Sequence, residues 1–156
     1  MKKMIKKVLV PIDFSDYSIN ALKYAVDFTQ HFEADMILIS VIEPMIYPAD
    51  FSMGQVAIPA TDQNLTERVE NELKDLAEKE IGDKVKTKRI IKSGKPFYEI
   101  NETARDEDVD LIIIATHGHT GVEHLLFGST AEKVVRKAPC PVLTLREPIK
   151  GFRFEE

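Results

Sequence analysis

Residues 115–130, ATHGHTGVEHLLFGST, gather most of the side chains in this sequence that could do chemistry. The stretch contains three of the four histidines, three of the seven glycines, and the pair Ser129 and Thr130. Histidines can bind a metal or transfer protons, whereas glycines ahead of a helix let backbone N–H groups approach a phosphate closely. The stretch is therefore compatible with a metal site, a hydrolytic site or a phosphate-binding loop.

The metal interpretation depends on three histidines with short spacing. His117 and His119 are separated by one residue, and His124 follows five residues later. Zinc sites usually add cysteine or carboxylate ligands at a fixed spacing. The only cysteine is Cys140, and Glu123 is the one carboxylate near these histidines. The pattern does not favour a metal site, and no metal ligand is assigned.

The hydrolytic interpretation needs a nucleophile, a base and an acid in one place. The G-x-S-x-G elbow is absent, and Ser129 follows a glycine at the expected start of a helix. Asp13, His117 and Ser129 could converge in a folded sheet, so a hydrolase acting on a phosphorylated small molecule stays an alternative. No catalytic residue is assigned.

The phosphate interpretation has a direct physical mechanism. A helix N-terminus offers N–H groups without intrahelical partners and the positive end of a dipole. Gly118, Gly121 and Gly128 precede the helix that we expect from Ser129 onward. The same residues begin an S-x-x-E pattern ending at Glu132, in which the Ser129 hydroxyl would cap its own helix. Phosphate binding and a capping box both stay open at this point.

The elements that must position these residues alternate along the chain. Apolar runs of strand length predict strands over residues 6–13, 34–42, 85–94, 110–116 and 141–147. Helical periodicity predicts helices over residues 15–32, 64–82, 96–108 and 129–138, the first capped by Ser15 or Asp16. Residues 43–61 lack either period and are expected to form a loop.

Alternating strands and helices predict an α/β fold. Right-handed crossovers most simply give a doubly wound, five-stranded parallel sheet in the order 3-2-1-4-5, with helices on both faces. We expect a single domain over residues 1–147 and a tail over residues 148–156. In this order the direction of winding changes between the first and fourth strands, and ligands bind outside the carboxyl ends of the strands there. Those ends are residues 11–13 and 115–118.

Composition excludes several classes of partner. The formal net charge is −5 and the pI near 5.5, so duplex nucleic acid is not expected, because phosphate contacts need clustered Lys and Arg. No window approaches the roughly 18 apolar residues of a membrane span. A single cysteine excludes an internal disulfide and fits a reducing compartment, so the expected location is cytoplasmic.

Three segments resemble the universal stress protein family over nearly the whole chain. They are KVLVPIDFSDYSINALKYA, SGKPFYEI and DLIIIATHGHTGVEHLLFGSTAEKVVRKAPCPVLTL. The ATP-binding branch of that family carries a glycine, two residues, a second glycine, nine residues, and then glycine followed by Ser or Thr. Gly118 and Gly128-Ser129 match the later part of this motif, whereas Ala115 replaces its first glycine.

The resemblance implies a Rossmann-like fold of the adenine nucleotide alpha hydrolase type and a nucleotide site. Asp13 would contact the ribose, and the backbone of Val41 would face adenine. The residues implied to contact the nucleotide are Pro11, Ile12, Asp13, Val41, Ala115, His117, Gly118, His119, Gly128, Ser129 and Thr130.

The resemblance also implies partners and an activity. The expected ligand is ATP, or ADP or AMP, with Mg²⁺ accompanying ATP, and any ATP hydrolysis is expected to be slow. A homodimer is expected through the last strand, PVLTLRE, from Pro141 to Glu147. The alternative is an interaction module of the same fold that binds no nucleotide, with Ala115 marking the loss.

Overall fold

The computed structural model describes residues 4–44, 63–117 and 127–147. Most of the expected loop at residues 43–61 and the whole expected tail at residues 148–156 lie outside these ranges. Gly118 and His119, two of the expected nucleotide contacts, also lie outside them. So do Gly121, Glu123 and His124, whereas the other expected nucleotide contacts are described.

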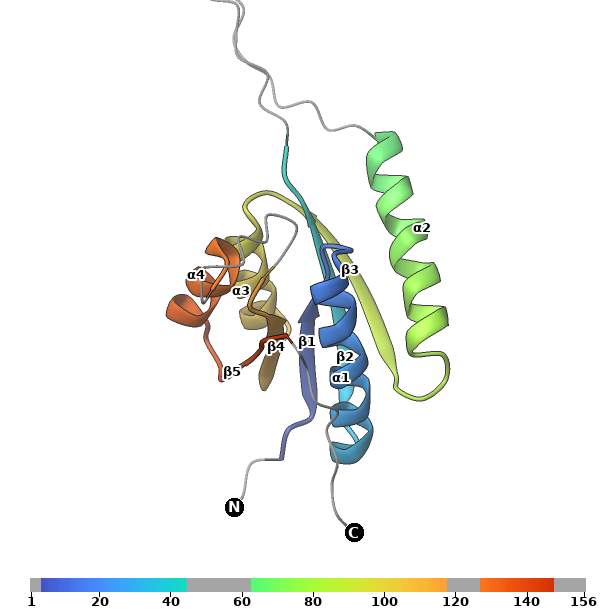
Figure 1. Ribbon diagram of the computed structural model, residues 1–156, viewed down its shortest axis with the longest axis vertical. Coiled ribbons are helices and arrows are strands. Elements are labelled where there is room, and N and C mark those ends of the chain that lie inside the picture. Colours follow the sequence, from blue (N-terminus) through green and yellow to red (C-terminus); the bar gives the residue numbers. More distant parts are fainter. Residues whose placement is uncertain (1–3, 45–62, 118–126, 148–156) are drawn as a thin grey trace, which may run out of the picture.

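Strands and helices alternate through the described ranges, as the sequence predicts (Figure 1). The boundaries agree with the expected ones to within a few residues. The strands are β1 (Lys7–Pro11), β2 (Asp35–Ile42), β3 (Thr87–Ser93), β4 (Leu111–Ala115) and β5 (Val142–Leu145). The helices are α1 (Asp16–Phe32), α2 (Gln63–Glu80), α3 (Pro96–Asp106) and α4 (Ser129–Lys137).

The sheet confirms the predicted topology. Its five strands lie in the order β3-β2-β1-β4-β5, and each neighbouring pair is parallel. Helices α1 and α2 cover one face, and α3 and α4 cover the other (Figure 1). The order places the carboxyl ends of β1 and β4 side by side, where the candidate residues were expected to meet.

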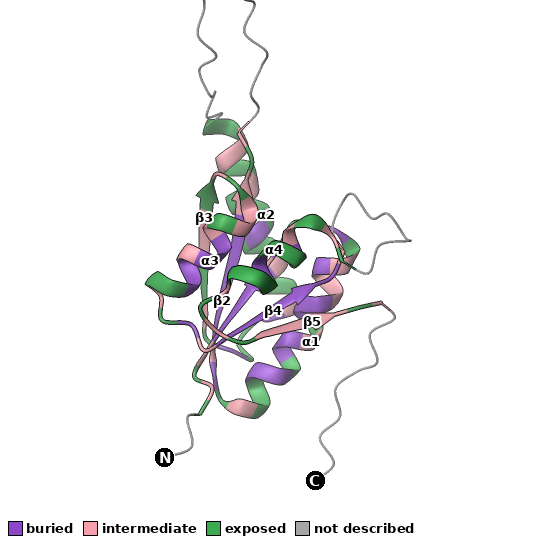
Figure 2. Ribbon diagram, turned by 90° about the vertical axis from the view of Figure 1, so that its left-hand side faces the viewer, coloured by how far each residue is buried: buried purple, intermediate pink, exposed green. Residues whose placement is uncertain are grey.

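Each face of the sheet has its own apolar core, because successive side chains of a strand point to opposite faces. On β1, Val8 and Val10 pack with α1 and α2, whereas Leu9 packs with α3 and α4. All five residues of β4 are buried, while those of the edge strands β3 and β5 are half-buried or exposed (Figure 2). Burial on both faces explains why the β4 sequence is a continuous apolar run.

Two polar side chains of α3, those of Asn101 and Thr103, are buried without a hydrogen-bond partner in the described part of the chain. Asn101 of α3 is 5% exposed, and neither its amide nitrogen nor its amide oxygen has a hydrogen-bond partner in the described part of the chain. A buried polar group in this state costs about 1–3 kcal/mol of stability. The polar side chain of Asn101 is therefore poorly suited to its buried environment.

Replacing Asn101 with leucine is expected to stabilise the protein. Leucine has a similar branched shape and no polar atoms, so Asn101→Leu should raise the free energy of unfolding by about 1–3 kcal/mol, measured by urea denaturation. Asn20→Leu is the matched control. In the wild type the Asn20 amide donates to Glu147 Oε1 over 2.7 Å, and the substitution removes this hydrogen bond, so it should not stabilise the protein. A decrease in stability for Asn101→Leu would contradict the prediction.

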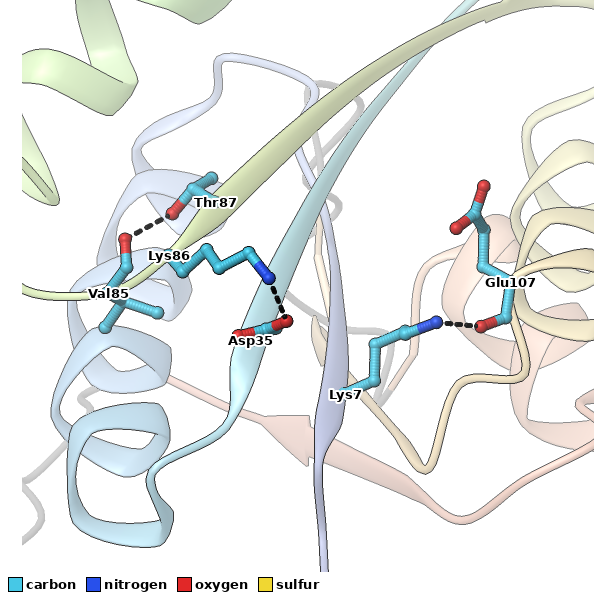
Figure 3. A network of polar contacts seen from close by, with 6 residues as sticks. All are labelled: Lys7, Asp35, Val85, Lys86, Thr87 and Glu107. Atoms are coloured by element: carbon cyan, nitrogen blue, oxygen red, sulfur yellow. Dashed lines mark hydrogen bonds and ion pairs between the residues drawn. The ribbon is translucent and has the colours of Figure 1, made fainter.

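Charged groups connect neighbouring elements at the amino edge of the sheet (Figure 3). Lys7 Nζ on β1 donates to the backbone oxygen of Glu107, just after α3, over 2.5 Å. Lys88 on β3 donates to Glu107 Oε1 over 2.7 Å, and Lys86 pairs with Asp35 over 3.1 Å. The hydrogen bond from Lys88 holds the pKa of the Glu107 carboxyl below its ordinary value of 4.5.

This pKa predicts a pH-dependent contribution of Glu107 to stability. A carboxyl whose pKa falls on folding stabilises the folded state above its unfolded pKa, and the contribution disappears as pH falls through the folded pKa. At pH 7, Glu107→Gln should lower the free energy of unfolding by about 0.2–1 kcal/mol, since the side chains of Lys88 and Glu107 are both partly exposed to solvent. Urea denaturation from pH 7 downward should show this difference shrinking below pH 4.5. Lys88→Met should abolish most of that pH dependence.

Candidate functional site

The turn between β1 and α1 carries Asp13 out of the sheet. The N–H of Ile12 still donates to Ile39 of β2 over 2.8 Å, but Asp13 is solvent-exposed. Phe14 follows in the left-handed region with φ of 63°, which is uncommon for a residue with a side chain. The Phe14 side chain packs against the α1/α2 core. The turn therefore holds the Asp13 side chain at the edge of the sheet where the strands end, and the packing of Phe14 fixes its backbone.

Hydrogen bonds within this turn hold the Asp13 carboxylate. Asp13 Oδ1 accepts from the Ser15 N–H over 2.9 Å and from the Ser15 hydroxyl over 2.5 Å. Ser15 Oγ in turn accepts from the Ser18 N–H over 3.2 Å, so Ser15 is the N-cap of α1. Of the two caps weighed from the sequence, Ser15 is confirmed. Asp13 thus belongs to the helix-capping arrangement and also lies at the sheet edge.

The end of β4 lies next to α1. Ala115 is the last residue of β4, is 8% exposed and lies opposite Leu145 of β5. The hydroxyl of the buried Thr116 and Nδ1 of His117 are 2.9 Å apart. The His117 ring lies 5.6 Å from the ring of Tyr17 on α1, at an interplanar angle of 38°. His117 is therefore oriented by groups from two elements.

Strand β2 continues beyond the end of β1, and this places the backbone of Val41. The last residue pair of the β1–β2 ladder is Pro11 with Ile39, whereas Val41 pairs with Lys92 of β3. Backbone N–H and C=O groups alternate between the two sides of a strand, and the carbonyl of Ile39 faces β1. The N–H and C=O of Val41, two residues on, consequently point to the same side, past the end of β1.

Helix α4 begins beside the end of β4. The N-cap is Gly128, with φ of −68° and ψ of 158°, and its N–H donates to the carbonyl of Thr116 over 2.5 Å. Because the N-cap is a glycine, the N-cap residue has no side chain to cap this helix. Ser129 is the first helical residue, and Glu132 pairs with Arg136 over 2.9 Å. The capping-box interpretation of Ser129 and Glu132 is therefore wrong, because the helix starts one residue before the position that this pattern requires.

The structure brings three groups of candidate residues to one edge of the sheet. These are the end of β1, the end of β4 and the start of α4, and the half-buried end of β2 borders the same edge. The sequence did not reveal the side chains of Ser18, Thr116 and Tyr17 at this edge, nor the hydrogen bond from Ser15, expected only as a helix cap, to Asp13. The spacing D-x-S-x-x-S could have indicated the two serines, because Asp and Ser often bond to nearby backbone groups. No local pattern connects Tyr17 with His117.

Three further observations bear on the kind of site. Within residues 4–44, 63–117 and 127–147, no three His, Cys, Asp or Glu side chains are grouped as metal ligands would be. The same ranges hold no helix long and apolar enough to cross a membrane. A hollow of about 360 Å³ lies between α2 and β3, lined in part by Leu73, Lys74 and Arg89. It includes none of the candidate residues.

Comparisons with known proteins agree with this arrangement. The model for the Universal stress protein family matches residues 4–146. Universal stress protein MJ0531 of Methanocaldococcus jannaschii is 34% identical over 152 residues, covering 96% of this chain and 86% of the relative. Universal stress protein MJ0577 of the same organism is 35% identical over 159 residues, covering 94% and 98%.

Solved structures show the same fold. The structure of MJ0577 aligns with a TM-score of 0.72 and 31% sequence identity, covering 95% of this chain and all of that one. A universal stress protein from Archaeoglobus fulgidus, solved in complex with dAMP, aligns with a TM-score of 0.61 over 91% of this chain and 98% of that one. Its sequence identity is 18%, so this likeness concerns the fold alone.

Proposed function

Because this chain belongs to the universal stress protein family, we propose that it binds an adenine nucleotide at the carboxyl edge of its sheet. The observation that carries the proposal is the start of α4, with glycine as its N-cap, beside the ends of β1 and β4. A relative of the same fold has been solved with dAMP, which supports a nucleotide as the ligand. The expected ligand is ATP, ADP or AMP.

The phosphates would lie at the start of α4. Backbone N–H groups in the first turn of a helix have no intrahelical partner, and the helix dipole favours a negative charge there. Ser129 and Thr130 supply such N–H groups, and the ion pair with Arg136 compensates the charge of Glu132. Gly118 and His119 are proposed to approach the same phosphates. Mg²⁺ would accompany ATP, held mainly by the phosphate oxygens.

The nucleoside would lie across the ends of β1 and β2. Asp13 is proposed to accept a hydrogen bond from the ribose, beside Pro11 and Ile12. The backbone N–H and C=O of Val41 point past the end of β1, where they could pair with the polar edge of adenine. A backbone donor and acceptor in that position would distinguish adenine from guanine, because the two bases present different edges.

The protein is proposed to act as a nucleotide-responsive homodimer in the cytoplasm, with at most slow ATP hydrolysis. The half-buried strand β5 forms one edge of the sheet, so a second copy could extend the sheet by pairing there. Light scattering with and without ATP would measure the oligomeric state. A monomer at all concentrations would contradict the dimer and leave the nucleotide proposal standing.

Calorimetric titration tests the central proposal. ATP, ADP and AMP should each release or absorb heat on binding and raise the melting temperature, whereas GTP should bind more weakly. A lack of both signals with every adenine nucleotide would overturn the proposal and favour the interaction module, with Ala115 in place of the first motif glycine. Phosphate release followed over hours, with His117→Ala for comparison, measures any hydrolysis.

A further inference from the structure

We propose that Ser15 is a positioning residue that sets the preference of this protein for a complete ribose over a deoxyribose. The inference rests on the proposed nucleotide site and concerns a side chain that the expected contacts do not include. Ser15 lies two residues after Asp13, and its hydroxyl donates to Asp13 Oδ1 over 2.5 Å. It would act through Asp13 without touching the nucleotide.

The orientation of an aspartate carboxylate is weakly determined by its own chain. The terminal torsion of Asp is broad, so the carboxylate plane turns easily unless neighbouring donors hold it. At Asp13, two donors from Ser15, the backbone N–H and the hydroxyl, converge on the same oxygen. The acceptor is a carboxylate oxygen, and hydrogen bonds to charged groups are about twice as strong as neutral ones. These donors select one orientation.

Ser15 is itself held in place from α1. Its Oγ accepts from the Ser18 N–H over 3.2 Å, and the Ser18 hydroxyl donates to the Ser15 carbonyl over 3.0 Å. Both serines are buried, at 7% and 5% exposure, so water competes little for these bonds. The left-handed backbone of Phe14, anchored by its ring in the core, fixes the distance between Asp13 and Ser15. The first turn of α1 thus orients the exposed carboxylate.

A preoriented carboxylate favours the ligand that makes the complete hydrogen bond. A ribose hydroxyl bonded to a charged oxygen contributes about 1.5–3 kcal/mol, or roughly tenfold to a hundredfold in affinity. That contribution falls if the carboxylate must be ordered during binding. Loss of the Ser15 hydroxyl should therefore weaken ATP more than an analogue without the contacted hydroxyl.

The capping function of Ser15 can be separated from this role. Glycine is also favoured at N-caps, so Ser15→Gly removes the hydroxyl donor to Asp13, keeps the backbone N–H donor and retains the helix start. Ser15→Thr keeps the hydroxyl and should restore the wild-type behaviour. Thr29→Val is the matched control, because it removes another buried hydroxyl of α1, one that donates to the Ala25 carbonyl within the helix over 2.5 Å. Ser15→Ala is a second variant in case Ser15→Gly folds poorly.

The test compares dissociation constants for ATP, 2′-deoxyATP and 3′-deoxyATP, measured by calorimetry on the full chain. In the wild type, ATP should bind about tenfold tighter than at least one analogue. Ser15→Gly should weaken ATP about fivefold to tenfold and leave that analogue unchanged, which reduces the ratio toward one. Thr29→Val should lower the melting temperature without changing the ratio.

Two results would overturn this inference and leave the nucleotide proposal intact. One is a wild type that binds ATP without distinguishing it from either analogue. The other is a Ser15→Gly protein with the wild-type ratio, which would show that Ser15 only caps α1. If the wild-type protein binds none of the three ligands, both the inference and the proposed function are overturned. This outcome is recognised from the wild-type titrations, without any variant.

Discussion

Replacing Asp13 with alanine is expected to weaken ATP binding about tenfold to a hundredfold, the range for losing a hydrogen bond to a charged group. The carboxylate lies exposed at the carboxyl end of β1, next to the end of β4. Adenosine should lose affinity by a similar factor, because the proposed contact is with the ribose. Calorimetric titration of both ligands measures the two factors.

Asp16→Ala provides the control for charge. Asp16 is also exposed and begins α1 three residues later, so the two variants change the net charge equally. Its effect on ATP affinity should be less than threefold, since an exposed charge at this range is largely screened by salt. Equal effects of the two substitutions would show that the site responds to overall charge, and Asp13 would lose its proposed role.

Replacing Ser129 with proline is expected to weaken ATP at least tenfold relative to Ser129→Ala. Proline lacks the backbone N–H, and each hydrogen bond from such a group to a phosphate contributes about 1.5–3 kcal/mol. The fold should tolerate it, because proline is favoured at the first helical position, which Ser129 occupies. Gly128 already has the extended backbone, with ψ of 158°, that a residue before proline requires.

The alanine variant separates the hydroxyl of Ser129 from its N–H. Adenosine, which has no phosphate, should bind the proline and alanine variants equally, whereas AMP and ATP should both prefer the alanine variant. Asp13→Ala differs from this pattern, because it should weaken the binding of adenosine as well as that of ATP. If the proline variant bound ATP as tightly as the alanine variant, with an unchanged melting temperature, the Ser129 N–H would have no part in phosphate binding.

Much of the fold could be predicted from the sequence because its signals are local and repeated. The apolar runs of β1, β2 and β4 and the helical periods between them determine the order of the elements, and right-handed crossovers limit how parallel strands can follow one another. The end of a parallel strand is also readable in a sequence. The placement of Asp13, Ala115 and His117 at one sheet edge followed from that knowledge alone.

Other features depend on contacts between distant residues, and only the tertiary structure decided them. The pattern from Ser129 to Glu132 fits a capping box, but the bond between Gly128 and Thr116, at the end of β4, places the helix start one residue earlier. A local pattern cannot predict this, because the tether comes from another element.

Contacts between distant residues also decide how α1 and the end of β4 meet at the site. Tyr17 and His117 lie 100 positions apart in sequence, and the packing of α1 against β4 brings their rings to 5.6 Å. The unpartnered amide of Asn101 also became visible only when α3 was packed. The sequence by itself determined the elements, their order and the edge that holds the site, since these follow from periodicity and chain direction. The tertiary structure decided which polar groups meet there, since hydrogen bonds depend on distances of a few tenths of an ångström that no spacing in the sequence encodes.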